Sequence, residues 1–152
     1  MIRSTLIAAA LLLSPLAVAH AQEAAPAPAH AEASAAVTFS FPDIKTHKGA
    51  LHVALFDSAE GWTSNKSIRA VTVEASDADP KARFEGLPAG TYAARVFQDI
   101  DGDGKMNRNA FGIPSEPFGF SNGAVPIMGP PSFEAAAFKA QAGDNAQTLP
   151  LY

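Results

Sequence analysis

The chain has 152 residues, and its 15 acidic against 11 basic side chains give a net charge of −4 at pH 7 with His neutral. An acidic chain without a cluster of Lys and Arg lacks the basic surface that a main partner such as nucleic acid or an anionic membrane requires. The chain contains no Cys, which excludes disulfides and a lipid-modified cysteine.

Residues 1–21 have the pattern of a secretory signal peptide. Arg3 precedes an apolar stretch over residues 6–18, and the small-residue triplet Ala19-His20-Ala21 follows. The apolar stretch is shorter than the roughly 20 residues that a membrane-spanning helix needs. We therefore expect an exported protein in the periplasm, at the cell surface or secreted, with cleavage before Gln22 and no membrane span in the mature form.

Residues 22–36 are nearly all Ala, Pro, His and Glu. Such a segment cannot bury enough apolar surface to offset the entropy of ordering it, which predicts a flexible linker. Residues 37–152 remain as one domain, long enough to build a single core. We expect this domain to be a monomer.

Apolar residues alternate with a period of two along this domain, which predicts half-buried strands rather than helices. The alternating residues are Val37, Phe39 and Phe41; Leu51, Val53 and Leu55; Val71, Val73 and Ala75; Ala82 and Phe84; Tyr92, Ala94 and Val96; Phe133, Ala135 and Ala137; Leu149 and Leu151. About seven short strands separated by turn residues predict an all-β fold, a single antiparallel β-sandwich. For residues 134–142 a short helix is the alternative.

Residues 99–132 show little strand or helix signal, and a loop of this length in a compact domain usually needs a reason. The segment begins Asp99-Ile100-Asp101-Gly102-Asp103-Gly104-Lys105-Met106-Asn107. This places oxygen-bearing side chains at positions one, three, five and nine, and Gly at position six, of an EF-hand-type calcium loop. Lys105 at position seven would contribute its backbone carbonyl.

Three carboxylates so close in sequence repel one another unless they lie apart in water or converge on a cation. We predict that they hold a structural Ca²⁺ that orders the long loop, and the alternative is a solvated, turn-rich acidic segment. Position twelve is Ala110 instead of the usual bidentate Glu, so another oxygen donor is needed. Glu116, the next carboxylate along the chain, is a predicted ligand, although it could instead be an acid in a pocket or a surface residue. The predicted ligand set is Asp99, Asp101, Asp103, Lys105, Asn107 and Glu116.

Several aromatic and imidazole side chains have both a structural and a functional interpretation. We interpret Phe111, Phe118 and Phe120 as a plug at the end of the sandwich rather than an exposed binding surface. Trp62 is interpreted as a core or edge residue rather than a recognition aromatic. His52 is expected on the outward face of its strand, and with His47 alone it makes a poor transition-metal site.

Four blocks carry a family resemblance: Gly49-Ala50-Leu51-His52-Val53-Ala54-Leu55-Phe56, residues 84–104, residues 111–122, and Gly129-Pro130-Pro131-Ser132-Phe133. Together they resemble the bacterial exported family named domain of unknown function 2141, over about residues 37–152. A broader similarity lies in Leu87-Pro88-Ala89-Gly90-Thr91-Tyr92, which looks like the turn and strand of carboxypeptidase-regulatory and transthyretin-like sandwiches. The resemblance implies an exported single β-sandwich, immunoglobulin-like or transthyretin-like, without a settled activity.

Enzyme signatures are missing from the sequence, which has no Cys nucleophile, Gly-x-Ser-x-Gly elbow, His-Glu-x-x-His or phosphate loop. We interpret the chain as a non-catalytic binding or structural module with a Ca²⁺-ordered loop, acting on an unknown ligand or protein at the cell envelope. One alternative is a small extracytoplasmic hydrolase that uses the loop carboxylates, and a pairing of Glu116 with Asp57 or Glu60 is one arrangement for it. Another is a carrier that holds a small apolar ligand inside the sandwich.

Overall fold

The computed structural model describes residues 34–42 and 44–152. The predicted signal peptide, its cleavage site and most of the predicted linker lie outside these residues. The first strand begins at Ala35, two residues before the predicted start of the domain. Within the described part of the chain, no helix has the length and apolarity needed to cross a membrane.

Strands dominate the described residues, and the helices are short. In chain order the elements are β1 (Ala35–Ser40), β2 (Ala50–Phe56), α1 (Ala59–Ser64), β3 (Arg69–Glu74), β4 (Lys81–Leu87), β5 (Gly90–Asp99), β6 (Phe118–Phe120), the 3₁₀ turn η1 (Ser121–Gly123), α2 (Phe133–Ala136), β7 (Phe138–Ala140) and β8 (Gly143–Thr148). The predicted all-β class is confirmed.

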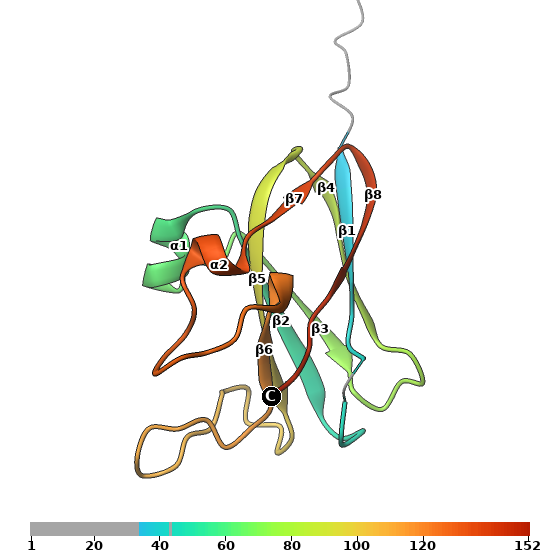
Figure 1. Ribbon diagram of the computed structural model, residues 1–152. Coiled ribbons are helices and arrows are strands. Elements are labelled where there is room, and N and C mark those ends of the chain that lie inside the picture. Colours follow the sequence, from blue (N-terminus) through green and yellow to red (C-terminus); the bar gives the residue numbers. More distant parts are fainter. Residues whose placement is uncertain (1–33, 43) are drawn as a thin grey trace, which may run out of the picture. The chain divides into compact units, whose positions relative to one another are not determined.

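The strands form two sheets (Figure 1). The smaller sheet has the order β4-β1-β8, and the larger has the order β3-β2-β5-β6 with β7 also paired to β5. All neighbours are antiparallel except β1 and β8, which run parallel. Residues 34–42 and 44–152 thus contain eight strands where the sequence predicted about seven, and one parallel pair where an antiparallel sandwich was predicted.

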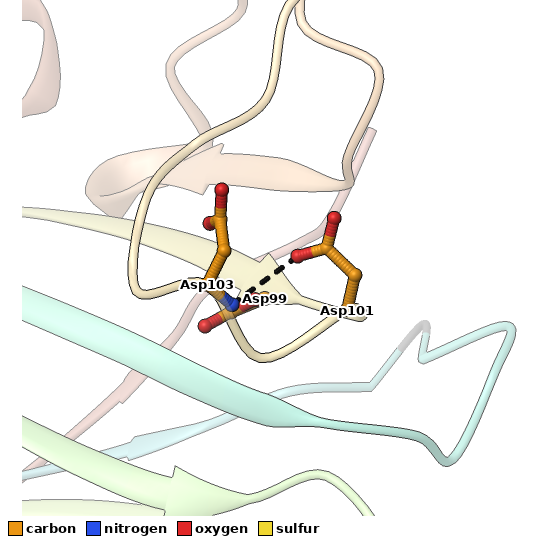
Figure 2. Close-up of side chains that lie close together, drawn as sticks. All are labelled: Asp99, Asp101 and Asp103. Atoms are coloured by element: carbon orange, nitrogen blue, oxygen red, sulfur yellow. Dashed lines mark hydrogen bonds between the residues drawn. The ribbon is translucent and has the colours of Figure 1, made fainter.

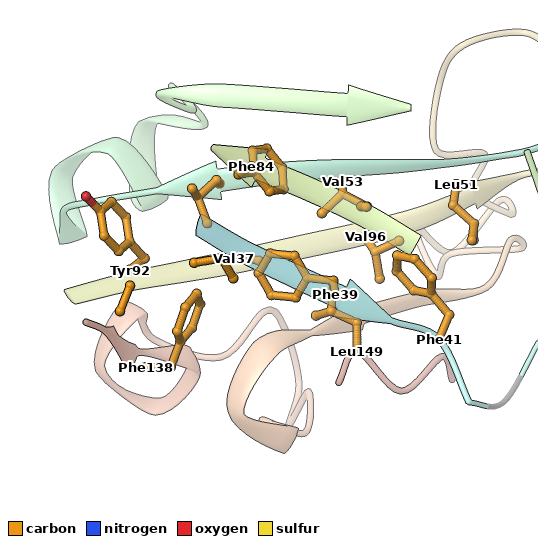
Figure 3. Packing of buried hydrophobic residues seen from close by; sticks show 14 of the residues in the cluster. Val37, Phe39, Phe41, Leu51, Val53, Phe84, Tyr92, Val96, Phe138 and Leu149 are labelled. Carbon is orange, nitrogen blue, oxygen red and sulfur yellow. The ribbon is translucent and has the colours of Figure 1, made fainter. Parts of the chain in front are cut away.

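The main core lies between the two sheets and follows from the period-two pattern. Val37 and Phe39 of β1 and Leu51, Val53 and Leu55 of β2 are all buried, as the alternation predicts. Figure 3 shows Val37, Phe39, Leu51 and Val53 pointing into one cluster, to which Leu55 also belongs. At its centre the Phe39 ring meets Phe84 and Phe138 edge to face, at centroid distances of 5.9 and 5.7 Å. Such pairs add about 0.5–1.5 kcal/mol to the burial of their area.

A second apolar cluster covers the other face of the larger sheet, under α1 and α2. It contains Phe56, Trp62, Ala93, Phe120, Ala124 and Ala136. The Trp62 ring is buried, and its Nε1–H donates a 2.8 Å hydrogen bond to the carbonyl of Pro131. The interpretation of Trp62 as a packing residue is confirmed.

Two predicted strands near the carboxyl end are wrong in detail. Residues 133–136 form the single turn α2, because Ser132 caps it by accepting a hydrogen bond from the Ala135 N–H. Only the alternative of a short helix anticipated this, and that helix ends earlier than expected. Leu149 and Leu151 are buried but follow β8, whose sequence Gly-Asp-Asn-Ala-Gln-Thr has the composition of a turn.

The long segment after Asp99 also contains a strand that was not predicted. β6 pairs with β5, so that Phe118 lies opposite Phe97 and Phe120 opposite Arg95. Phe118 and Phe120 pack against the second cluster, as the plug interpretation predicts. Phe111 does not, since its side chain is 88% exposed, and for this residue the interpretation is wrong.

Candidate metal centre

The acidic cluster lies where β5 ends and the long loop begins. Asp99 is the last residue of β5, and its backbone is fixed because it pairs with Ala50 of β2. One carboxylate oxygen from each of Asp99, Asp101 and Asp103 falls within 4.8 Å of the others. Figure 2 shows the three side chains gathered around one turn of the loop. The convergence that the spacing predicted is present in the structure.

Backbone N–H groups hold these carboxylates in place. Asp99 accepts hydrogen bonds from the N–H groups of Gly102 and Gly104, at 2.7 and 2.8 Å. Asp101 accepts from the Asp103 N–H and Asp103 from the Lys105 N–H. Gly102 and Gly104 have φ of 79° and 76°, a region that strongly favours glycine, so these two glycines permit the tight winding.

Asp99 is the buried member of the cluster, with its side chain 4% exposed. Desolvation by itself raises the pKa of Asp99, but the N–H groups of Gly104 and Gly102, followed by His52, outweigh it. The net pKa of Asp99 is therefore lower than its ordinary value, which favours the ionised form that a cation would bind. Asp101 and Asp103 are exposed to solvent.

Of the other three predicted ligands, Lys105 contacts the cluster through its backbone N–H, Asn107 joins it through its side chain, and Glu116 does not join it. The Asn107 side chain reaches it, since Nδ2 donates a 2.7 Å hydrogen bond to Asp101 Oδ2. Glu116 lies outside the cluster, and its Oε1 and Oε2 accept hydrogen bonds from the backbone N–H groups of Ile100 and Asn107, at 2.8 and 3.0 Å. Its role as a ligand stays a prediction. Glu116 joins the two ends of the acidic turn, a role that sequence spacing did not indicate.

Replacing Glu116 by Gln is expected to destabilise the ion-free protein by about 2 kcal/mol. An amide has a single oxygen, so its NH₂ group would face either the Ile100 or the Asn107 N–H and one charge-assisted bond, typically about 1.5–3 kcal/mol, would be lost. Urea unfolding in the presence of a chelator measures this loss. Glu74→Gln, on the exposed face of β3, is the control and should change stability by less than about 0.5 kcal/mol. Equal losses of stability in Glu116→Gln and Glu74→Gln would contradict the role of Glu116 in joining the two ends of the acidic turn.

His52 contacts the cluster, and sequence analysis missed this. Its Nε2 lies 3.5 Å from Asp99 Oδ2, its Nδ1 lies 3.1 Å from the Thr72 hydroxyl, and its ring stacks on Phe97. The alternation placed His52 correctly on the outward face of β2. Its proximity to Asp99 depends on the register between β2 and β5, which the local sequence does not encode.

The carboxylate pair needed by the alternative hydrolase is not assembled. Asp57 and Glu60 follow the end of β2 at Phe56, whereas Glu116 is bonded at the end where Ala50 pairs with Asp99. Seven strand residues separate these ends by roughly 20 Å. A hollow of about 290 Å³ does adjoin Glu116, but Glu116 is the one acidic side chain among the residues that line it.

Three comparisons with known proteins bear on this domain. The profile of a family described as "uncharacterized protein conserved in bacteria (DUF2141)" matches residues 40–148. A comparison with curated proteins and one with solved structures each gave no match. The matched range includes the acidic turn, Glu116 and every strand of both sheets, apart from the first five residues of β1.

Proposed function

Since the chain belongs to the DUF2141 family of uncharacterized bacterial proteins, we propose a function from the site itself: an exported, non-catalytic β-sandwich module whose long loop is held in shape by a bound Ca²⁺. The observation that carries the proposal is the convergence of Asp99, Asp101 and Asp103 within 4.8 Å. Three carboxylates at this separation repel one another, and a divalent cation between them would reverse the sign of that interaction.

The chemistry of the donor set favours calcium. Carboxylate, amide and carbonyl oxygens are the hard ligands that Ca²⁺ takes in numbers of six to eight. Asp99, Asp101 and Asp103 would supply carboxylate oxygens and Lys105 its backbone carbonyl. The Asn107 amide, whose Nδ2 faces Asp101, would turn over so that its oxygen faces the ion. Mg²⁺ demands a near-ideal octahedron, which a largely exposed turn does not enforce.

The expected affinity is low, because Ala110 occupies the position of the usual bidentate Glu. Removing one carboxylate from the set weakens binding, and extracellular calcium modules bind in the range of about 10⁻⁴–10⁻³ M. That range suits a protein outside the cytoplasm. Export itself is proposed from the signal-peptide pattern in residues 1–21.

Calcium is expected to raise the melting temperature of the mature protein, and a chelator to lower it. A ligand that binds only the folded state stabilises it by about 2.7 kcal/mol at a hundredfold excess over its dissociation constant. For a domain of this size that corresponds to a rise of roughly 10 °C. Differential scanning calorimetry across a calcium titration measures the effect, and the same titration with Mg²⁺ should give a smaller one.

The double variant Asp101→Asn, Asp103→Asn should abolish the calcium-dependent rise. Asp77→Asn, an exposed aspartate in the turn between β3 and β4, is the matched control and should keep it. A melting temperature of ion-free protein that does not respond to millimolar calcium would refute the proposal. So would an equal rise in the double variant, since the ion would then bind elsewhere.

A further inference from the structure

A groove of about 960 Å³ lies outside the sandwich, on the far face of the larger sheet. Its floor is formed by outward-facing residues of β2, β3, β5 and β6, and its rim by residues 104–114 and 126–130 of the long loop. In Figure 1 both parts of the loop lie on the side of β2 and β5 opposite β1 and β8. The groove adjoins the acidic turn, since Gly104, Lys105 and Met106 line it, but the carboxylates of the turn do not. Its size is typical of small-molecule sites.

The rim of this groove exposes large apolar side chains to solvent. Phe111 and Met128 line it and are 88% and 106% exposed, and Ile113 beside them is 58% exposed. Phe97 and Phe118 continue the apolar surface along the floor. Exposed apolar side chains that gather at one groove usually mark a surface that binds something.

The charges of the groove have a single sign. Arg95, Lys105 and Arg108 line it together with His52, and no Asp or Glu does. The chain as a whole carries four more acidic than basic groups, so a basic lining is opposite to the overall balance. A single-sign lining attracts a ligand of the opposite charge.

Arg95 is the deepest of these cations. Its guanidinium stacks on the Trp62 ring at 3.8 Å and lies 5.0 Å from the centroid of Phe56. Its nitrogens donate to the Asn65 side chain and the Trp62 carbonyl, while Nε is buried without a partner, and no carboxylate within the described residues forms an ion pair with it. Desolvation lowers the pKa of Arg95, so an anion nearby would compensate a real cost.

We propose that this groove binds a small amphiphilic anion, a free medium- to long-chain carboxylate whose headgroup lies near Arg95 and whose tail runs along Phe97, Phe111 and Met128. The charge of the lining selects the headgroup, and the exposed rim would be covered by the tail. This site differs from an apolar cavity inside the sandwich, because the space between the two sheets is filled by the main core.

Titration with dodecanoate tests the proposal, using mature protein stripped of lipid in calcium-free buffer, because calcium precipitates long-chain carboxylates. Trp62 is the only tryptophan of the chain and contacts Arg95, so its fluorescence reports on the floor of the groove. Saturable one-to-one binding is expected by fluorescence and by calorimetry. Dodecanol, which has the same tail without the charge, should bind at least tenfold more weakly, and dodecyltrimethylammonium should not bind.

Variants of the rim residues distinguish binding in the groove from non-specific hydrophobic binding. Phe111→Ser and Met128→Ser should each weaken dodecanoate at least fivefold without lowering the melting temperature, because both side chains are exposed. Ile127→Ser is the matched control, since Ile127 is 82% exposed but does not line the groove, and its affinity should be unchanged. Arg95→Lys should retain most of the preference for dodecanoate over dodecanol, and Arg95→Gln should lose it.

Three results would overturn the proposal. One is equal affinity for dodecanoate and dodecanol, and another is unaltered binding in both rim variants. The third is binding to phosphatidylglycerol vesicles without binding of free dodecanoate, which would make the rim a membrane-contact surface. These outcomes are distinct from those that test calcium binding, because calcium binding is tested by the change in melting temperature with the metal alone.

Discussion

Gly49→Ala is expected to lower the free energy of unfolding by more than about 3 kcal/mol. A Cβ on Gly49 would lie 1.8 Å from the carbonyl oxygen of Asp99 and 2.8 Å from its carbonyl carbon. The residue also has φ of +67°, a conformation that costs an L-amino acid about 1–2 kcal/mol. Relief of the overlap requires the backbone of Asp99 to move, and Asp99 both pairs with β2 and begins the acidic turn.

Gly86→Ala is a close control for this substitution. Gly86 has φ of +66°, and a Cβ at this residue would have no atom within 4 Å. Its loss should be about 1 kcal/mol, which reports the backbone term alone. The midpoint of urea unfolding at constant slope measures both variants. If Gly49→Ala and Gly86→Ala lowered the free energy of unfolding by similar amounts, β2 and β5 would be able to move apart at Gly49 without a cost in stability.

Ser121→Ala is expected to lower the free energy of unfolding by about 2–6 kcal/mol, the second large effect. The Ser121 side chain is fully buried between β5 and α2. Its hydroxyl accepts a 2.7 Å hydrogen bond from the Ala94 N–H and donates one of 2.6 Å to the Ala136 carbonyl. Alanine would leave both backbone groups buried and unsatisfied, at about 1–3 kcal/mol each.

Ser64→Ala controls for the loss of a hydroxyl. Ser64 is exposed at the end of α1 and bonds only to carbonyls of its own helix. Its replacement should change stability by less than about 0.5 kcal/mol. A small loss in both variants would mean that water replaces the Ser121 hydroxyl, and the tie between β5 and α2 would then be weaker than the geometry indicates.

The strands that the sequence predicted correctly are those in which every second residue enters the main core. In β1, β2 and β5 the alternation records which side chains enter the core, so Phe39, Leu51 and Val96 could be assigned without coordinates. β8 could not, because its polar residues form a strand by pairing with the backbone of β1. α2 is four residues long, too short for a helical period to show.

The candidate site divides in a similar way. The acidic turn is local, so the spacing of Asp99, Asp101 and Asp103 was sufficient to predict that the three converge. The hydrogen bonds that Glu116 accepts from Ile100 and Asn107 cross the loop, and the contact of His52 with Asp99 joins two strands. Neither follows from a motif. The groove around Arg95 is assembled from four strands, two loop segments and Asn65 at the end of α1, and for that reason it had no signature in the sequence.

The position of β1 between β4 and β8 limits when this domain can fold. One edge of β1 needs residues 81–87 and the other needs residues 143–148. The smaller sheet therefore cannot form completely until residues 143–148 are available to pair with β1. Strand pairings between residues so far apart in sequence form slowly, in milliseconds to seconds. A nascent chain therefore cannot complete the smaller sheet until residues 143–148 have been made, and until then one edge of β1 has no partner strand.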